Sequence, residues 1–196
     1  MKISFLASHG GSSARAIIQA MTGGELDAEP GILITNNLDS NIYTWCKAIQ
    51  FPVFHVSSKT HSDPIAEDLA ILTILQEAET DIVVCSGYMK MIGLETLAGF
   101  ENRILNIHPA LLPLYGGVGM FGDSVHATVL AAGDAESGAT VHIVTEDYDE
   151  GPVIGQSQVD VLPDDTVDSL RQRVQETEPG LYIDCLKKFL ARHKLD

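Results

Sequence analysis

Short apolar runs alternate with segments of helical periodicity through the first half of the chain. Residues 2–7, 31–35, 53–56, 81–85 and 103–108 are mostly apolar, and each is the length of a single strand. Strands that are apolar on both faces are typical of a parallel sheet that helices cover on both sides. The segments between these runs are long enough to supply those helices.

Helices are predicted between these strands over residues 14–21 and 40–50, and from residue 64 onward. The third has a typical start, because Asp63 is a good N-cap and Pro64 suits the first helical position. The spacing of the leucines and isoleucine predicts its apolar face, made of Ile65, Leu69, Leu72 and Leu75.

The second half of the chain has a different pattern. Residues 139–145 and 153–162 form longer strand-like runs around the acidic turn 147–152, which predicts an antiparallel hairpin. Residues 165–175 and 180–193 are predicted helices, and the Gly- and Pro-rich segment 109–123 is a predicted ordered loop. The fold class is therefore α/β: a mostly parallel twisted sheet with helices on both faces, Rossmann-like in its N-terminal half, with an antiparallel C-terminal hairpin.

The length and the charge of the chain limit the number of domains and the kinds of partner that we expect. A chain of 196 residues is expected to form a single domain over 1–196. With 12 basic and 27 acidic residues the net charge is −15, and such a surface repels nucleic acid.

No apolar run reaches the roughly 18 residues of a membrane span, and the first apolar run is too short for a signal peptide. The three widely spaced cysteines predict neither disulfides nor a metal pair, so we expect a cytoplasmic protein.

The turn after the first strand is rich in glycine and serine. It comprises residues 8–13, and Gly11, Ser12 and Ser13 come just before the first predicted helix. Backbone N–H groups at a helix N-terminus bind phosphate well. The same pattern also fits a tight turn with a serine cap, and it matches neither a Walker loop nor a dinucleotide fingerprint.

Asn106 and His108 stand at the end of the fifth strand, two residues apart. Alternation puts both side chains on one face of that strand, and ligands of open α/β sheets bind at the carboxyl ends of strands. An amide and an imidazole side by side can donate hydrogen bonds to one oxygen. The alternative for such a histidine is a hydrogen-bonded residue of the core. Asp149 lies in the acidic turn 147–152, which is also compatible with an ordinary solvated turn.

Four segments together resemble the folate-dependent formyltransferases: the opening strand with Gly11-Ser12, the Ser-Gly-Tyr-Met segment 86–89, the block 106–113 and the block 138–154. The resemblance continues through Arg173 to Glu178 and covers nearly the whole chain. The compact length and the C-terminal segment favour the branch that acts on glycinamide ribonucleotide. The resemblance implies transfer of a formyl group from 10-formyltetrahydrofolate to an amine, without a metal.

The resemblance also implies a role for each matched residue. Asn106 and His108 would stabilise the negative charge on the formyl oxygen, and Asp149 would keep His108 protonated and assist proton transfer. Gly11, Ser12, Ser13, Gln175 and Glu178 would hold the phosphate and ribose of the amine substrate. The residues implied in folate binding are Met89, Lys90, Ile92, Leu105 and Val144.

The chain departs from the family pattern at several positions. Ser13 replaces an asparagine of the phosphate loop, Lys90 replaces an arginine, and the loop 116–122 is longer than in the shortest members. His126 is either a second active-site histidine or a residue of a helix surface. The alternatives are a formyltransferase for a sugar amine or for methionyl-tRNA, a formyltetrahydrofolate hydrolase, and a non-catalytic folate or nucleotide binder. The partners expected are small molecules, not nucleic acid or membrane, in a monomer or homodimer.

Overall fold

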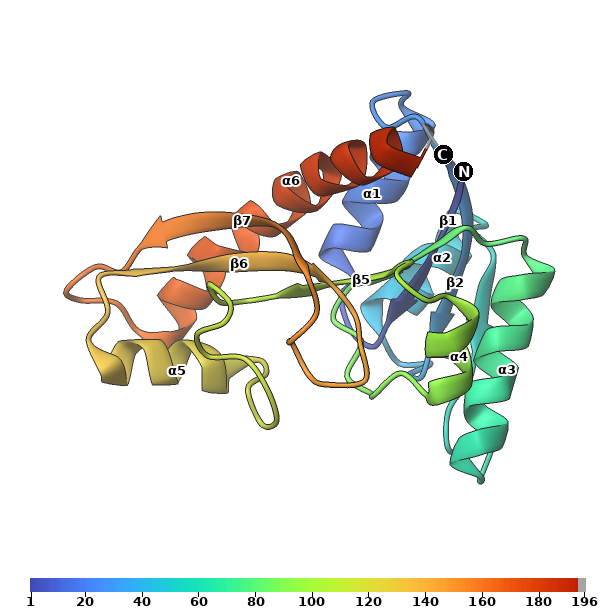
Figure 1. The fold of residues 1–196 in the computed structure, drawn as a ribbon, viewed down its shortest axis with the longest axis horizontal. Helices are drawn as coiled ribbons and strands as arrows, with labels where there is room; N and C mark the ends of the chain where they lie inside the picture. The colour runs from blue at the N-terminus through green and yellow to red at the C-terminus, as the bar shows by residue number, and fades with distance from the viewer. Residues whose placement is uncertain (194–196) are drawn as a thin grey trace. The chain divides into compact units, whose positions relative to one another are not determined.

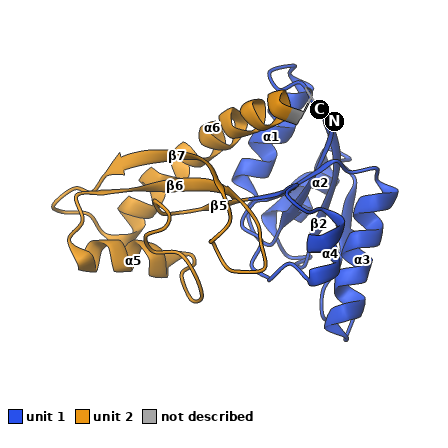
Figure 2. Cartoon of the chain, viewed as in Figure 1, with its two compact units in different colours: residues 1–105 blue, residues 106–196 orange. Residues whose placement is uncertain are grey.

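The computed structural model describes residues 1–193 and contains an α/β fold (Figure 1). Its sheet has the strand order β3-β2-β1-β4-β5-β6-β7. The order β3-β2-β1-β4 is that of Rossmann-like sheets, as the sequence predicts. The chain divides into two compact units, residues 1–105 and 106–196 (Figure 2). The expectation of a single domain over residues 1–196 stays a prediction.

The first unit is built on parallel strands. β1 (Lys2–Ala7) pairs in parallel with β2 (Glu29–Thr35) and β4 (Ile82–Cys85), and β2 pairs in parallel with β3 (Val53–His55). The side chains of β1 from Ile3 to Ala7 are all buried, as expected for a strand covered on both faces. The five predicted strands are confirmed, with ends that differ by one or two residues.

Helices α1 (Ser12–Thr22) and α3 (Pro64–Glu77) lie on opposite sides of these strands (Figure 2). The unit also contains α2 (Asn41–Ala48) and α4 (Leu94–Gly99). Ser40 caps α2 through its hydroxyl, and Asp63 caps α3 ahead of Pro64, as predicted for the latter. The short helix α4 was not predicted from the sequence.

The predicted apolar face of α3 is correct at Leu75 but wrong at Ile65 and Leu69, and Leu72 is half-buried. Ile65 and Leu69 are exposed, and the buried face carries Glu67 and Asp68 together with Ile71 and Leu75. Asp68 accepts hydrogen bonds from the backbone N–H groups of Glu95 and Thr96, so it satisfies donors at the start of α4. α3 therefore buries Asp68 because a neighbouring helix needs an acceptor there, and it buries Glu67 in an ion pair with Lys90.

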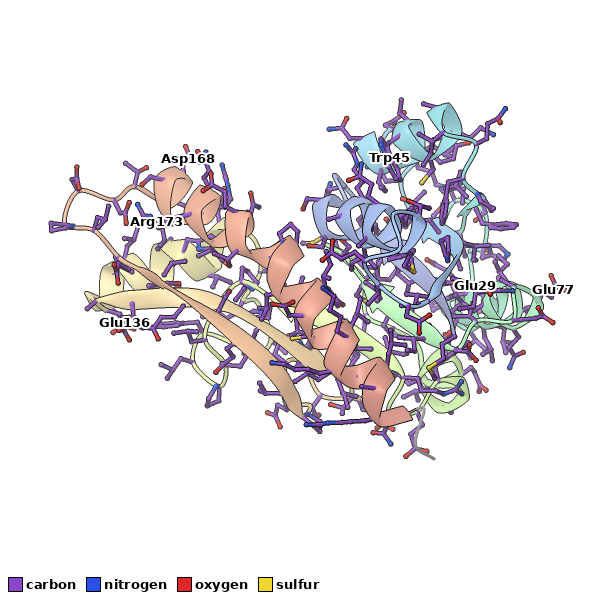
Figure 3. All side chains as sticks on the ribbon, turned by 90° about the horizontal axis from the view of Figure 1, so that it is seen from above. Glu29, Trp45, Glu77, Glu136, Asp168 and Arg173 are labelled. Atoms are coloured by element: carbon purple, nitrogen blue, oxygen red, sulfur yellow. The ribbon has the colours of Figure 1, made fainter. Side chains whose placement is uncertain are left out.

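In the second unit the antiparallel hairpin is confirmed. β6 (Glu136–Ile143) pairs antiparallel with β7 (Val153–Asp160), and α5 (Asp123–Ala132) precedes β6. α6 (Val167–His193) packs against both strands and against α5. Arg173, labelled near the start of α6 in Figure 3, forms an ion pair with Asp165 and donates to the Asp160 carbonyl.

Two predictions for this unit need correction. The C-terminal segments 165–175 and 180–193 belong to one helix, α6, which continues through Pro179. Packing along its length offsets the backbone hydrogen bond that proline removes. α5 occupies the chain immediately after the predicted loop and was not predicted. Across the described residues no helix is long and apolar enough to cross a membrane.

Candidate active site

His108 ends β5 (Ile104–His108), and its side chain is 4% exposed. Strand alternation places it on the same face as Asn106, while Ile107 points to the other face. Both ring nitrogens of His108 face polar groups. Nε2 lies 2.7 Å from the carbonyl oxygen of Tyr115, and Nδ1 lies 3.4 Å from Oδ2 of Asp149.

The contact with Tyr115 determines where the proton of neutral His108 lies. A carbonyl oxygen only accepts hydrogen bonds, so Nε2 carries the hydrogen and donates it. Nδ1 is then the nitrogen that gains or loses a proton, and it faces the carboxylate of Asp149.

Asp149 is held from three sides. Its backbone adopts a left-handed conformation, with φ 59°, which aspartate tolerates better than most residues. The backbone N–H of Gly117 donates to Oδ2 at 3.0 Å, and Nε2 of His142 lies 3.5 Å from Oδ1. The carboxylate thus lies between two histidines and a backbone donor.

His142, on β6, connects Asp149 with Asn106. Its Nε2 lies 3.2 Å from Nδ2 of Asn106, and its Nδ1 lies 3.0 Å from the carbonyl oxygen of Ile143. In the neutral ring, Nδ1 donates to that carbonyl and Nε2 accepts from the Asn106 amide. Only a doubly protonated ring could also donate to Asp149. Asn106, His108 and Asp149 therefore come together as expected, with His142 as a fourth member.

Burial and charge oppose each other at His108. Burial lowers its pKa below the ordinary value and outweighs both the negative charge of Asp149 and the hydrogen bond to Tyr115, which raise it. Asp149 therefore acts on His108 in the expected direction but is outweighed by burial in the resting site, and its role in keeping His108 protonated stays a prediction. Burial also raises the pKa of Asp149, but the contacts with His142, His108 and Gly117 hold it below its ordinary value.

The glycine-serine turn begins α1 in the first unit. Gly11 has φ 58° and ψ 39°, and no side chain among residues 1–193 caps the helix. The hydroxyl of Ser13 is buried and, within the described part of the chain, has no hydrogen-bond partner. Ser86, which follows β4, accepts a hydrogen bond from the N–H of Ala14. The turn thus presents helix N–H groups and an unpaired hydroxyl.

Arg15, one turn into α1, stacks over the ring of Trp45 at 5.5 Å (Trp45 is labelled in Figure 3). This contact fixes a cation near the start of the helix.

The implied ribose residues lie on α6. Gln175 is exposed and Glu178 is half-buried, three residues along the same helix. Burial raises the pKa of Glu178 from 4.5 to about 7.

The implied folate residues have different environments. Ile92 and Leu105 are buried, Met89 is 46% exposed and Val144 is half-buried. Lys90 forms an ion pair with the buried carboxylate of Glu67, so its charge already has a partner.

His126, on α5, is 1% exposed, so the helix-surface interpretation is wrong. Burial lowers its pKa, and Asp123 opposes this effect.

Sequence reasoning missed Tyr115 and His142. His142 lies within the predicted strand 139–145, so a polar side chain inside an apolar run is the signal that could have found it. Tyr115 contributes a carbonyl group, which no residue type marks. Within residues 1–193 no cluster of three or more His, Cys, Asp or Glu side chains is arranged to hold a metal ion.

The chain belongs to the formyl transferase family, whose model matches residues 1–186. It is 36% identical over 185 residues to the chloroplastic phosphoribosylglycinamide formyltransferase of Arabidopsis thaliana, covering 93% of this chain and 63% of the relative. It is 34% identical over 188 residues to the Haemophilus influenzae phosphoribosylglycinamide formyltransferase, and the match covers 96% of this chain and 86% of that relative. The crystal structure of glycinamide ribonucleotide transformylase 1 from Symbiobacterium toebii matches with a TM-score of 0.90 at 32% identity, covering 96% and 87%. The chain thus spans less than two thirds of the plant relative.

Proposed function

We propose that this chain transfers the formyl group of 10-formyltetrahydrofolate to the amine of glycinamide ribonucleotide, a step of de novo purine biosynthesis. The proposal is carried by the cluster of the buried His108 and His142 with the half-buried Asn106 and Asp149 in a chain of this family. Relatives at 34–36% identity that bear the name phosphoribosylglycinamide formyltransferase support the choice of acceptor.

Asn106 stabilises the charge that develops on the formyl oxygen. When the amine attacks the formyl carbon, electrons move onto that oxygen, and a preorganised donor lowers the barrier. The side-chain amide of Asn106 has two N–H bonds, and the contact with His142 uses one. The second donates to the oxyanion. Losing such a donor typically costs about 2.7–4 kcal/mol of transition-state stabilisation.

His108 and Asp149 handle the proton. The attacking amine must lose a proton after the new C–N bond forms, and the folate nitrogen must gain one as its bond to the formyl carbon breaks. Nδ1 of His108 is the available basic nitrogen, and the carboxylate of Asp149 at 3.4 Å stabilises the imidazolium that forms. The positive charge of the imidazolium also stabilises the negative charge that develops on the formyl oxygen.

The phosphate of the acceptor binds at Gly11, Ser12 and Ser13. The uncapped start of α1 and the unpaired hydroxyl of Ser13 support this assignment, because both gain a partner when an anion binds. Gln175 holds the phosphate end and Glu178 the ribose hydroxyls, and both stand on α6.

10-Formyltetrahydrofolate is the co-substrate. Met89, Lys90, Ile92, Leu105 and Val144 contribute to its pocket, with backbone groups reading the pterin over apolar side chains. Neither a metal nor nucleic acid nor a membrane takes part. We place the protein in the cytoplasm as a monomer or homodimer.

The test offers 10-formyltetrahydrofolate with four acceptors: glycinamide ribonucleotide, glycinamide, an amino-sugar nucleotide and water. We expect turnover with the first, and a far higher KM for glycinamide because it lacks the phosphate. Preferred turnover of the amino sugar would identify a sugar-amine formyltransferase. Turnover with water alone would identify a hydrolase, and no turnover with any acceptor would identify a binding protein. Asn106→Asp should lower kcat roughly 10²–10³-fold. Asn41→Asp, on the exposed start of α2, is the matched control.

A further inference from the structure

The turn 115–117 contacts both His108 and Asp149. The Tyr115 carbonyl accepts the hydrogen bond from Nε2 of His108, and the Gly117 N–H donates to Asp149. A Cβ added at Gly116 would lie 3.2 Å from Cβ of Asp149 and 2.6 Å from Cδ2 of Leu112. The turn is therefore packed against the site, with no room for a side chain at its centre.

Tyr115 needs a specific conformation to make this contact. Its φ is 56°, in the left-handed region that a bulky residue rarely occupies. Its hydroxyl donates a hydrogen bond to Oδ2 of Asp134, directly after Gly133, which caps the end of α5. This side-chain bond fixes Tyr115 at the edge of α5 and directs its carbonyl toward His108. The unfavourable backbone is thus maintained by a contact outside the reacting cluster.

We propose that Tyr115 and Asp134 are positioning residues that fix the proton of neutral His108 on Nε2 and so reserve Nδ1 for the proton of the reaction. The inference rests on the proposed function and deepens it. The amine forms its bond to the formyl carbon and gives a proton to Nδ1. The bond between that carbon and the folate nitrogen then breaks, and the same proton passes to the departing nitrogen. The proton count balances, and no other reactant is required.

The charged and titratable neighbours of His108 are consistent with this division of its nitrogens. Asp149 faces Nδ1, and the positive form of His142 disfavours that of His108. The charge of His108 in turn lowers the pKa of His126 on α5. Asp149 is therefore the neighbour that favours a proton on Nδ1, and the Tyr115 carbonyl keeps Nε2 from competing for that role.

The tautomer can be measured directly. In protein labelled with ¹⁵N-histidine, the seven histidines are assigned with His108→Asn as the reference, and the ring shifts of His108 are followed against pH. Wild type should show hydrogen on Nε2 when neutral. Tyr115→Phe and Asp134→Ala remove the anchor and should give a mixed tautomer and a lower His108 pKa. Asp134→Asn keeps an acceptor and should restore most of the wild-type spectrum.

Kinetics give the second readout. Loss of the anchor should lower kcat roughly tenfold, about the effect of one hydrogen bond, and move the acidic limb of the kcat profile to lower pH, with KM for both substrates nearly unchanged. Tyr43→Phe on α2 and Asp123→Asn at the other end of α5 are controls expected to behave as wild type.

An unchanged tautomer in both Tyr115→Phe and Asp134→Ala overturns the proposal, even if kcat falls, because a merely structural role would reduce kcat without moving the proton. The spectra need no substrate. A tautomer shift in a protein that fails to formylate glycinamide ribonucleotide would therefore refute the proposed function and leave the positioning role intact.

Discussion

Replacing Glu178 with glutamine should stabilise the protein, and the gain should grow with pH. Burial raises the pKa of this carboxyl group from 4.5 to about 7, so the folded chain holds a proton that the unfolded chain releases. Where the folded state binds more protons, the free energy of unfolding falls as pH rises. Ionised Glu178 therefore destabilises the fold, and the destabilisation is complete above pH 7.

The magnitude follows from the two pKa values. Linkage gives a destabilisation of about 1.4 kcal/mol at pH 5.5 and about 3 kcal/mol at pH 8, both upper bounds because the side chain is only half-buried. Glutamine has a similar shape and no charge, so Glu178→Gln should recover these amounts. The advantage of the variant should grow by up to about 2 kcal/mol between the two pH values, or roughly 4–8 °C in Tm for a chain of this size.

Denaturant unfolding followed by circular dichroism is the assay, because the only tryptophan, Trp45, lies in the other unit. Both pH values avoid the isoelectric point near 4.6, where the protein is least soluble. Glu176→Gln removes the same charge from an exposed position of α6 and corrects for the net negative charge. Equal gains in the two variants, or a Glu178→Gln gain that is the same at pH 5.5 and pH 8, would refute the reasoning. If Glu178 holds the ribose, the stabilised variant should also show a higher KM for the acceptor.

The remaining predictions concern the two ends of the reaction. Asp149→Asn should lower the His108 pKa further and reduce kcat, because the variant loses the negative charge that favours the imidazolium. NMR titration and pH profiles test this, with Asp147→Asn as the control. An unchanged His108 pKa together with a normal kcat would remove Asp149 from the mechanism. Ser13→Ala should leave stability unchanged or slightly higher but raise the KM for the phosphorylated acceptor, whereas Ser137→Ala, another buried unpaired hydroxyl, should leave KM alone. Gly11→Ala should lower the free energy of unfolding by about 1–2 kcal/mol because of its left-handed backbone, and further because the new Cβ would lie 2.8 Å from the Ile42 side chain. Gly24 also has a left-handed backbone but has open space around it, so an equal loss of stability in Gly24→Ala would refute the clash.

The strands were predictable because burial on both faces leaves a continuous apolar run. β4 (Ile82–Cys85) is buried along its whole length and is recognisable from composition alone. α4 and the face of α3 were not, because Asp68 is buried by a hydrogen-bonding need of α4 that hydropathy does not record. At Pro179 the sequence predicts a break that the structure does not have. Proline has a low helix propensity, but tertiary packing maintains α6 through this position.

The sequence predicts those site residues whose side chains perform the chemistry, because the residue type is visible in the sequence. Asn106 and His108 follow from strand alternation and their position at a strand end. Asp149 is 41 residues further along the chain from His108, and only resemblance to a family connects the two. The carbonyl of Tyr115 belongs to every residue type, so its role depends on a backbone conformation that the sequence does not indicate.

The opposite effects at His108 and Asp149 explain why the resting site suits a reaction that moves a proton. If Asp149 alone determined the state of His108, the ring would already be charged and could not accept a proton from the amine. Burial lowers the His108 pKa, while the contacts around Asp149 keep its carboxylate ionised. Burial therefore favours a neutral imidazole in the resting pair, and the contacts around Asp149 favour its anion. The electrostatics of the pair improve when a proton reaches Nδ1, at the moment when negative charge appears on the formyl oxygen. Stabilisation that grows between the ground state and the transition state raises kcat instead of merely tightening binding.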